Sequence, residues 1–322
     1  MRPIQRGGGL ALIGTVFLLA WQSSGWTENW LDRDGKAELR RDGTSQPPDS
    51  NTASSKDFTV ELTLPARYSS NVASASVDSI VEKRGDSHVG PDLNLKWARQ
   101  YDWAKLSAEV GAGTERYLST HDANIDSLYS TFKIQMTDGK SERFVPYALV
   151  SNSVYFLPTF HSTDIIYQDV VAGFYTGIGW RDKDRIPYRD ALIPRSDATE
   201  PGDVAVTFDA RIGRRISDVT DYQNTFVAAK AELGYTFSRN WRIDAASKFR
   251  ASWYENYHGE RRTDYRPGAE IGLTWTPDWL AALVKRSELS MNFGIYRNFS
   301  NIPDKTYTLW DVGPTLSLRT KF

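Results

Sequence analysis

The 322-residue sequence contains no cysteine, which excludes disulfide bridges, thiolate metal sites and a lipid-modified N-terminal cysteine. It also lacks an excess of either charge: 39 Lys and Arg residues stand against 40 Asp and Glu residues, which leaves no basic footprint for nucleic acid. Beyond residue 20 no apolar run reaches the about 20 residues that a transmembrane helix needs, so only strands could cross a membrane. We expect no cofactor, no metal ion and no nucleic-acid partner.

Aromatic residues are abundant instead. They make up 13% of the chain, with 11 Trp and 16 Tyr, although the mean hydropathy is only -0.49. A transmembrane β-barrel looks polar on average because only alternate residues face lipid, and its aromatic rings gather at the two membrane interfaces. Aromatic residues near the ends of alternating segments are Trp97, Trp103, Trp180, Tyr235, Phe237, Trp241, Trp253, Trp275 and Trp310.

The N-terminus has the pattern of a secretory signal peptide. Arg2 and Arg6 form a basic region, residues 10–20 form a short apolar region, and the small residues 23–25 follow where a peptidase could cut. Residues 26–56 have no sustained period and are rich in Asp, Gly, Ser and Pro. We therefore expect a signal peptide over residues 1–25, a flexible periplasmic tail over 26–56 and a barrel over 57–322.

From residue 57 onward the chain divides into segments in which every second residue is apolar, as in a strand with one face towards lipid. We call the odd-numbered or even-numbered positions of a strand, which share one face, a parity. Twelve segments are expected: Phe58–Leu64, Leu93–Trp97, Leu106–Ala112, Leu128–Met136, Arg143–Ser153, Val170–Trp180, Val204–Ile212, Val227–Phe237, Ile243–Trp253, Ala269–Trp275, Leu289–Ile295 and Trp310–Phe322. Arg143–Ser153 is apolar on both parities, so its facing is open. The long connection 181–203 allows a missed hairpin, hence fourteen strands, or a plug, and residues 277–283 suggest a short helix. A soluble antiparallel sandwich is the alternative fold.

The last segment alternates down to a terminal aromatic residue, Phe322. This closing strand resembles that of bacterial outer-membrane β-barrels, in which the barrel-assembly machinery recognises a final Phe or Trp. The resemblance implies an all-β, transmembrane, antiparallel up-and-down barrel in the outer membrane of a Gram-negative bacterium. It also implies the lipid bilayer and that machinery as partners, with Phe322 as the assembly signal. No motif of a specific family accompanies it.

Charged residues fall on the parity opposite to the apolar one, because a charge facing lipid would cost about 2 to 4 kcal/mol at mid-membrane. The predicted lumen residues are Lys96, Lys133, Asp209, Arg211, Lys230, Glu232, Arg242, Asp244, Lys248, Arg250, Arg266 and Glu270. Two interpretations compete: the charges line opposite walls of a wet channel, or they pair across a narrow lumen and fill it. The row from Arg242 to Arg250 is similar to the lining of arginine-rich twelve-stranded channels for acidic oligosaccharides, although the carboxylates dilute its charge.

The sequence thus predicts a non-catalytic pore for passive or substrate-selective passage of hydrophilic solutes, saccharides among them. One alternative is an accessory barrel for polysaccharide export or assembly that uses the 26–56 tail. The other is an outer-membrane hydrolase, because all four histidines fall in expected outer loops or at their margins: His88, His121, His161 and His258. In that case Ser119 and His121, two positions apart, would be candidates for nucleophile and base, and His161 with Asp164 for an acid-base pair.

Overall fold

The structure is a computed structural model that describes residues 58–72, 85–137, 144–181, 202–284 and 286–321. The described strands are β1 (Phe58–Ser69), β2 (Asp86–Val89), β3 (Asp92–Gln100), β4 (Lys105–Tyr117), β5 (Ile125–Gln135), β6 (Val145–Phe156), β7 (Thr163–Arg181), β8 (Asp203–Ser217), β9 (Asn224–Ser238), β10 (Trp241–Tyr257), β11 (Glu260–Trp275), β12 (Arg286–Ser300) and β13 (Tyr307–Lys321). Short helices are η1 (His121–Ala123), η2 (Pro158–Phe160), η3 (Thr220–Tyr222), α3 (Asp278–Leu283) and η4 (Pro303–Lys305). No helix in the described ranges is long and apolar enough to cross a membrane.

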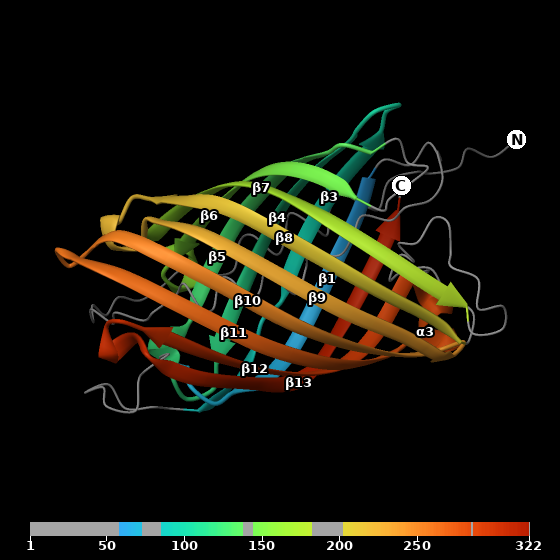
Figure 1. The fold of residues 1–322 in the computed structure, drawn as a ribbon. Coiled ribbons are helices and arrows are strands. Elements are labelled where there is room, and N and C mark those ends of the chain that lie inside the picture. Colours follow the sequence, from blue (N-terminus) through green and yellow to red (C-terminus); the bar gives the residue numbers. More distant parts are fainter. Residues whose placement is uncertain (1–57, 73–84, 138–143, 182–201, 285, 322) are drawn as a thin grey trace, which may run out of the picture.

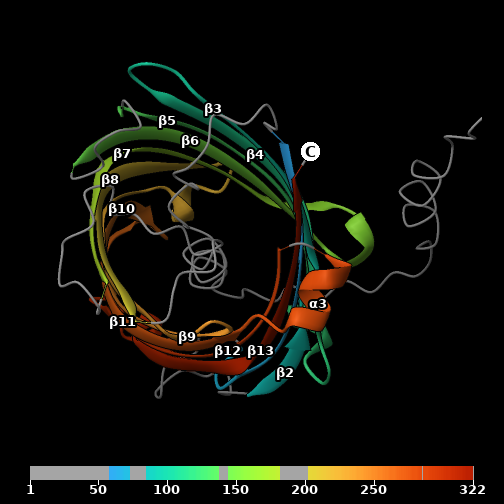
Figure 2. The ribbon, with the colours of Figure 1, turned by 90° about the vertical axis from the view of Figure 1, so that its right-hand side faces the viewer.

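The strands close into a ring, because β1 pairs antiparallel with β13 as well as with β3 (Figure 2). β2 and β3 together fill one place in this ring, since both pair with β1 on one side and β4 on the other. Pro91, which has no N–H to donate, falls at the interruption between them. Across this gap the Gly90 N–H still donates to the Pro65 carbonyl at 3.1 Å. The Thr114 N–H donates to the Pro91 carbonyl at 2.9 Å. The ring therefore has twelve strands, not fourteen, and the described part of each predicted segment falls on one of them.

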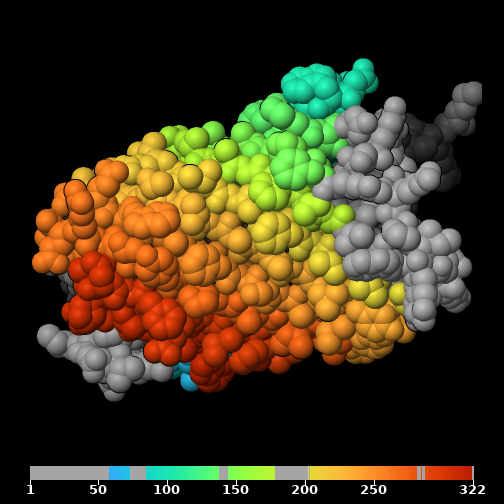
Figure 3. Space-filling view, viewed as in Figure 1, coloured from blue at the N-terminus to red at the C-terminus, as the bar shows by residue number. Residues whose placement is uncertain are grey.

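The outer face of the ring is apolar. On β10, for example, the side chains of Ile243, Phe249 and Trp253 are exposed, and the alternate residues Lys248 and Arg250 are buried. In space-filling view the side formed by β8 to β13 is a continuous convex surface (Figure 3). An apolar exterior around a closed barrel is the arrangement that a bilayer requires, because every strand finds its hydrogen bonds within the ring.

Aromatic residues mark two edges of this apolar belt. At the end where β1 begins and β13 ends, which we name the inner end, Trp241 stacks on Trp275 with ring centroids 5.6 Å apart, and Phe237 lies 6.4 Å from Trp241. At the opposite, outer end, Tyr68 lies 5.2 Å from Trp310. Aromatic residues thus lie in two groups, one at each end of the barrel, as expected for residues at the two membrane–water interfaces.

The connections at the two ends differ (Figure 1). Four outer connections each contain one short helical turn, η1 to η4. At the inner end, β9 and β10 are joined by only two residues, whereas β11 and β12 are joined through α3, which confirms the helix expected after Pro277. Several predictions lie outside the described residues: the signal peptide, the 26–56 tail, the hairpin or plug in 181–203, and Phe322.

Candidate functional site: the barrel lumen

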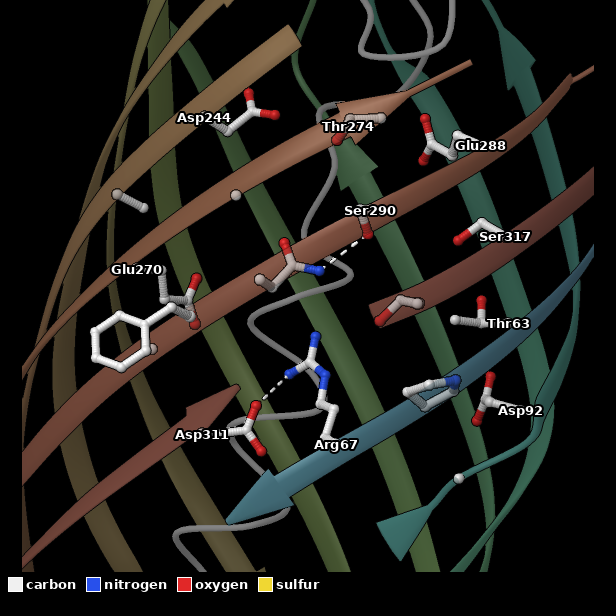
Figure 4. Close-up of a pocket in the computed structure, with 18 of the residues that line it drawn as sticks. Thr63, Arg67, Asp92, Asp244, Glu270, Thr274, Glu288, Ser290, Asp311 and Ser317 are labelled. Carbon is white, nitrogen blue, oxygen red and sulfur yellow. Dashed lines mark hydrogen bonds and ion pairs between the residues drawn. The ribbon is translucent and has the colours of Figure 1, made fainter. Parts of the chain in front are cut away.

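The lumen contains a cavity of about 370 Å³, and most of the residues that line it have polar or charged side chains. Figure 4 shows lining side chains that project from β1, β10, β11, β12 and β13 towards the interior. Of the twelve predicted lumen residues, five line this cavity: Lys96, Lys230, Arg242, Asp244 and Glu270. The other seven lie on the same inward parity of their strands, outside the cavity lining: Lys133, Asp209, Arg211, Glu232, Lys248, Arg250 and Arg266.

Oppositely charged residues of the lumen contact neighbours on the same wall. Two of the pairs join residues two apart on one strand: Arg242 Nε to Asp244 at 2.8 Å and Lys230 Nζ to Glu232 at 2.7 Å. Others join adjacent strands, as Lys248 Nζ does with Glu270 at 2.8 Å. Positions i and i+2 of a strand, and paired positions of adjacent strands, share a face, so these contacts run along the wall.

One cluster on β1, β3, β4 and β13 is centred on Glu61, which is 7% exposed. Its carboxylate accepts hydrogen bonds from Lys96 at 2.8 Å and from Arg319 at 2.9 Å. Glu109 lies 3.9 Å from the same Lys96 ammonium. A buried carboxylate held by two cations is a neutralised group, because an isolated buried charge would be far more costly than the pair. The cluster therefore contributes polarity to the wall without a strong field.

Lys133 lies in an aromatic setting on β5. Its ammonium lies 4.1 Å from the ring centroid of Tyr147 and 5.6 Å from that of Tyr175, both favourable cation–π positions. The Tyr147 hydroxyl in turn donates to Asp209 at 2.8 Å. Tyr147 and Tyr175 also pack with Val145, Val171 and Phe226 in a buried cluster. This cluster settles the facing of β6, which was left open: Val145 and Tyr147 face inward, although they are apolar, and Val150 faces lipid.

Several charged lumen residues were missed by sequence analysis because the strands extend past the predicted ends. Arg67 on β1 donates to Asp311 on β13 at 2.8 Å (Figure 4). Arg215 on β8 donates through Nε to Asp169 on β7 at 2.8 Å, and Arg262 on β11 donates through Nε to Asp264 at 3.0 Å. Each continues the inward parity of its strand, so extending the alternation three to seven residues further would have found them.

Another part of the cavity wall carries uncharged polar side chains, with Glu288 beside them (Figure 4). Hydroxyl and amide side chains from four adjacent strands form it, and we name it the hydroxyl strip: Thr63, Thr274, Ser290, Asn292, Thr315 and Ser317. Within it, Asn292 Nδ2 donates to Ser290 at 2.9 Å (Figure 4). The Thr315 hydroxyl in the strip and the Tyr296 hydroxyl elsewhere in the cavity lining have no hydrogen-bond partner in the described part of the protein. These groups are the donors and acceptors that a polar solute would meet.

The four histidines do not share one location. His88, expected at the margin of an outer loop, lies in the short strand β2, is 8% exposed, and its Nε2 is 3.2 Å from Glu115. The other three are at outer connections, where His258 Nδ1 lies 2.8 Å from Asp221. Ser119, the suggested nucleophile beside His121, uses its backbone N–H to bond Asp86.

Asp86 fixes an outer connection beyond the aromatic edge formed by Tyr68 and Trp310. Its carboxylate accepts hydrogen bonds from the backbone N–H groups of Ser119, Thr120 and Ser87, at 2.8, 2.6 and 2.8 Å. Burial raises the pKa of Asp86, but these three donors outweigh burial and hold the pKa below its usual value. The ionised carboxylate is therefore a fixed part of this outer end.

We expect Asp86→Asn to lower the hydrogen-exchange protection of the Ser119 and Thr120 amides at neutral pH by about tenfold, because bonds to a charged acceptor are worth about 1.5 to 3 kcal/mol. Because the pKa of Asp86 is lower in the folded state than in the unfolded state, the stabilisation by its carboxylate is fully present above the ordinary aspartate pKa. This stabilisation is lost as the pH falls through the lower, folded-state pKa. Wild type and variant should therefore converge in acid. Asp304→Asn, in an exposed position of η4, is the matched control. Equal protection at neutral pH would contradict this assignment.

No family model and no curated protein matches the sequence. Solved structures resemble it at low identity. The translocator domain of the autotransporter NalP from Neisseria meningitidis is 11% identical, with 92% of this chain and 100% of that chain covered and a TM-score of 0.47. Outer membrane phospholipase A from Escherichia coli is 11% identical, covering 80% and 92%, with a TM-score of 0.41. The outer membrane channel DcaP of Acinetobacter baumannii is also 11% identical, covering 82% and 96%, with a TM-score of 0.40.

These neighbours are a translocator domain, a phospholipase and a channel. The location does not depend on the activity. A closed antiparallel ring with an apolar belt, aromatic edges and a polar interior is suited to a bilayer on its outside and to water on its inside. The chain is a twelve-stranded β-barrel of the Gram-negative outer membrane.

Proposed function

We propose that the barrel is a pore for small hydrophilic solutes, with neutral, saccharide-like polyols as the class that its lining suits best. The observation that carries the proposal is the pairing of lumen charges along each wall, which leaves a polar cavity between the walls. Charges that filled the interior would instead pair across it. Lys230, Arg242 and Lys248 are each held by a neighbouring carboxylate, which favours neutral over anionic solutes and disfavours the acidic-oligosaccharide interpretation.

The hydroxyl strip supports the solute class. A sugar presents several hydroxyl groups, and each can donate to a carboxylate or exchange hydrogen bonds with Ser, Thr or Asn side chains. Asp92 and Asp311 lie on the same side of the cavity as the strip (Figure 4). Such a wall offers many weak and equivalent bonds, which allow a solute to enter and to leave.

Planar-bilayer recording of the full-length refolded protein tests the pore. We expect discrete conductance steps with weak ion selectivity, as measured by reversal potentials in asymmetric salt. Ala246→Trp places a large ring in the cavity that Ala246 lines, whereas Ala245→Trp places it on the exposed outer face of the same strand. The first variant should conduct less than wild type and the second should match it. A folded wild-type barrel without conductance would contradict the proposal.

A further inference from the structure

The apolar outer face contains a ladder of polar side chains. Ser130 on β5, Asn152 on β6 and Gln168 on β7 occupy directly paired positions on three adjacent strands. Asn152 Nδ2 donates to Ser130 Oγ at 3.3 Å, and Gln168 Nε2 donates to Asn152 Oδ1 at 3.0 Å. Asn152 and Gln168 are exposed and point away from the lumen, since the alternate residues Ser151, Ser153 and Asp169 are buried. We name these three residues the amide ladder.

The amide ladder lies within the apolar belt. Along each strand the outward positions two residues before and two residues after it are apolar: Leu128 and Phe132 on β5, Val150 and Val154 on β6, and Ile166 and Val170 on β7. The ladder also ends against apolar residues on its two flanks, because Ser130 pairs with Val110 and Gln168 pairs with Ile216. Both of these are exposed on the outer face. The ladder therefore borders apolar residues along its three strands and at both flanks, while Arg214 and Asp218 lie two positions before and after Ile216 in the chain.

Hydrogen bonds within the ladder do not use its full capacity. An amide side chain offers two donors and an acceptor oxygen, and Gln168 uses one donor. Its Oε1 accepts no hydrogen bond from the described residues. Acyl chains supply no partner, and an unsatisfied polar group in hydrocarbon costs several kcal/mol. Arg214, on the neighbouring strand β8, shows the contrast: its guanidinium is bonded to Glu255 at 2.6 Å and to Thr225 at 3.0 Å.

We propose that the amide ladder is the centre of an interface between two copies of this chain in the membrane. A second copy fits because a carboxamide is its own complement: a twofold axis through the ladder brings the donors of one copy to the acceptors of the other. Hydrogen bonds between such side chains stabilise association inside bilayers, and small neighbours let the two surfaces approach. Ala148 and Ala172 are such neighbours, since they pair with each other on the same outer face of β6 and β7. This inference does not depend on the pore function.

The chain has no cysteine, so single-cysteine variants report on the interface without background. In native outer membranes under oxidising conditions, Asn152→Cys and Gln168→Cys should give a disulfide-linked adduct of twice the chain mass. Phe293→Cys, on the exposed outer face of β12, is the matched control and should crosslink severalfold less. Equal crosslinking at all three positions, or an adduct with another protein, would overturn the proposal.

A second measurement keeps the test independent of disulfide geometry. Sedimentation of wild type in detergent should show a dimer, and Asn152→Leu combined with Gln168→Leu should show a folded monomer, because leucine is at least as well tolerated on a lipid face. Heat-modifiable gel mobility verifies that this variant is folded. A monomeric wild type, or a dimer that persists in the folded double variant, contradicts an interface at the amide ladder.

Discussion

Replacing Arg242, Lys248 and Arg250 together by glutamine should leave the barrel folded and shift its ion selectivity towards cations. Two of these cations are bonded to carboxylates, Arg242 to Asp244 and Lys248 to Glu270. Arg250 instead stacks on Phe226, with its guanidinium carbon 3.8 Å from the ring centroid, and donates to Ser252 at 2.9 Å. The substitution therefore removes the cations to which Asp244 and Glu270 are bonded.

In a water-filled lumen each pair is worth about 1 kcal/mol at close contact, so the fold should survive. The same energy, applied to a passing ion, corresponds to about a fivefold rise in the permeability ratio of potassium to chloride. Reversal potentials in asymmetric potassium chloride measure this ratio, and thermal melting measures the fold. In a filled, dry lumen the stranded carboxylates would instead lower stability by several kcal/mol, and neither protein would conduct.

A compensated variant separates a charge effect from a general distortion of the wall. Adding Asp244→Asn and Glu270→Gln to the triple substitution removes the two exposed carboxylates. Selectivity should then return towards that of wild type, although five side chains have changed. A compensated variant that stays as cation-selective as the triple variant would show that other lumen carboxylates control selectivity.

The parts of this fold that follow from sequence are those set by the two-residue period. Ile243 to Trp253 alternates between lipid and lumen over its whole length, so both its position and its facing were predictable. β6 was not, because Tyr147 faces the lumen while Val150 faces lipid. An aromatic cluster inside the barrel removes the contrast on which the period depends.

Ion pairing was only partly predictable. Arg242 with Asp244 is a same-face pair on one strand, which the spacing of two already indicates. Glu61 with Arg319 joins the first strand to the last, and Lys248 with Glu270 joins β10 to β11. Those contacts depend on strand register, which turn geometry and closure set and which alternation alone leaves open. The same holds for the amide ladder, whose members are unremarkable until the register places them side by side.

Arginine at Ala245 should destabilise the barrel by about 2 to 4 kcal/mol, whereas arginine at the adjacent Ala246 should leave folding unaffected. Ala245 is exposed on the outer face of β10, between Trp241 at the inner aromatic edge and Trp253 towards the other end of the strand. A guanidinium there lies within the apolar belt, where no counter-ion is at hand. The cost should appear as a lower free energy of folding into lipid vesicles, measured by denaturant titration.

Ala246 is the matched control because the same substitution, one residue further, enters the opposite environment. It lines the cavity and pairs in register with Glu232 on β9 and Glu270 on β11, so a new guanidinium meets two carboxylates. Its folding free energy should stay within about 0.5 kcal/mol of wild type, as for a substitution that creates neither a cavity nor an unpaired charge. Equal losses for the two variants would show that the outer and inner faces of β10 do not differ as its alternation indicates. If only Ala246→Arg lowered the folding free energy, the assignment of the two faces of β10 would be reversed, with lipid on the side that carries the charged residues.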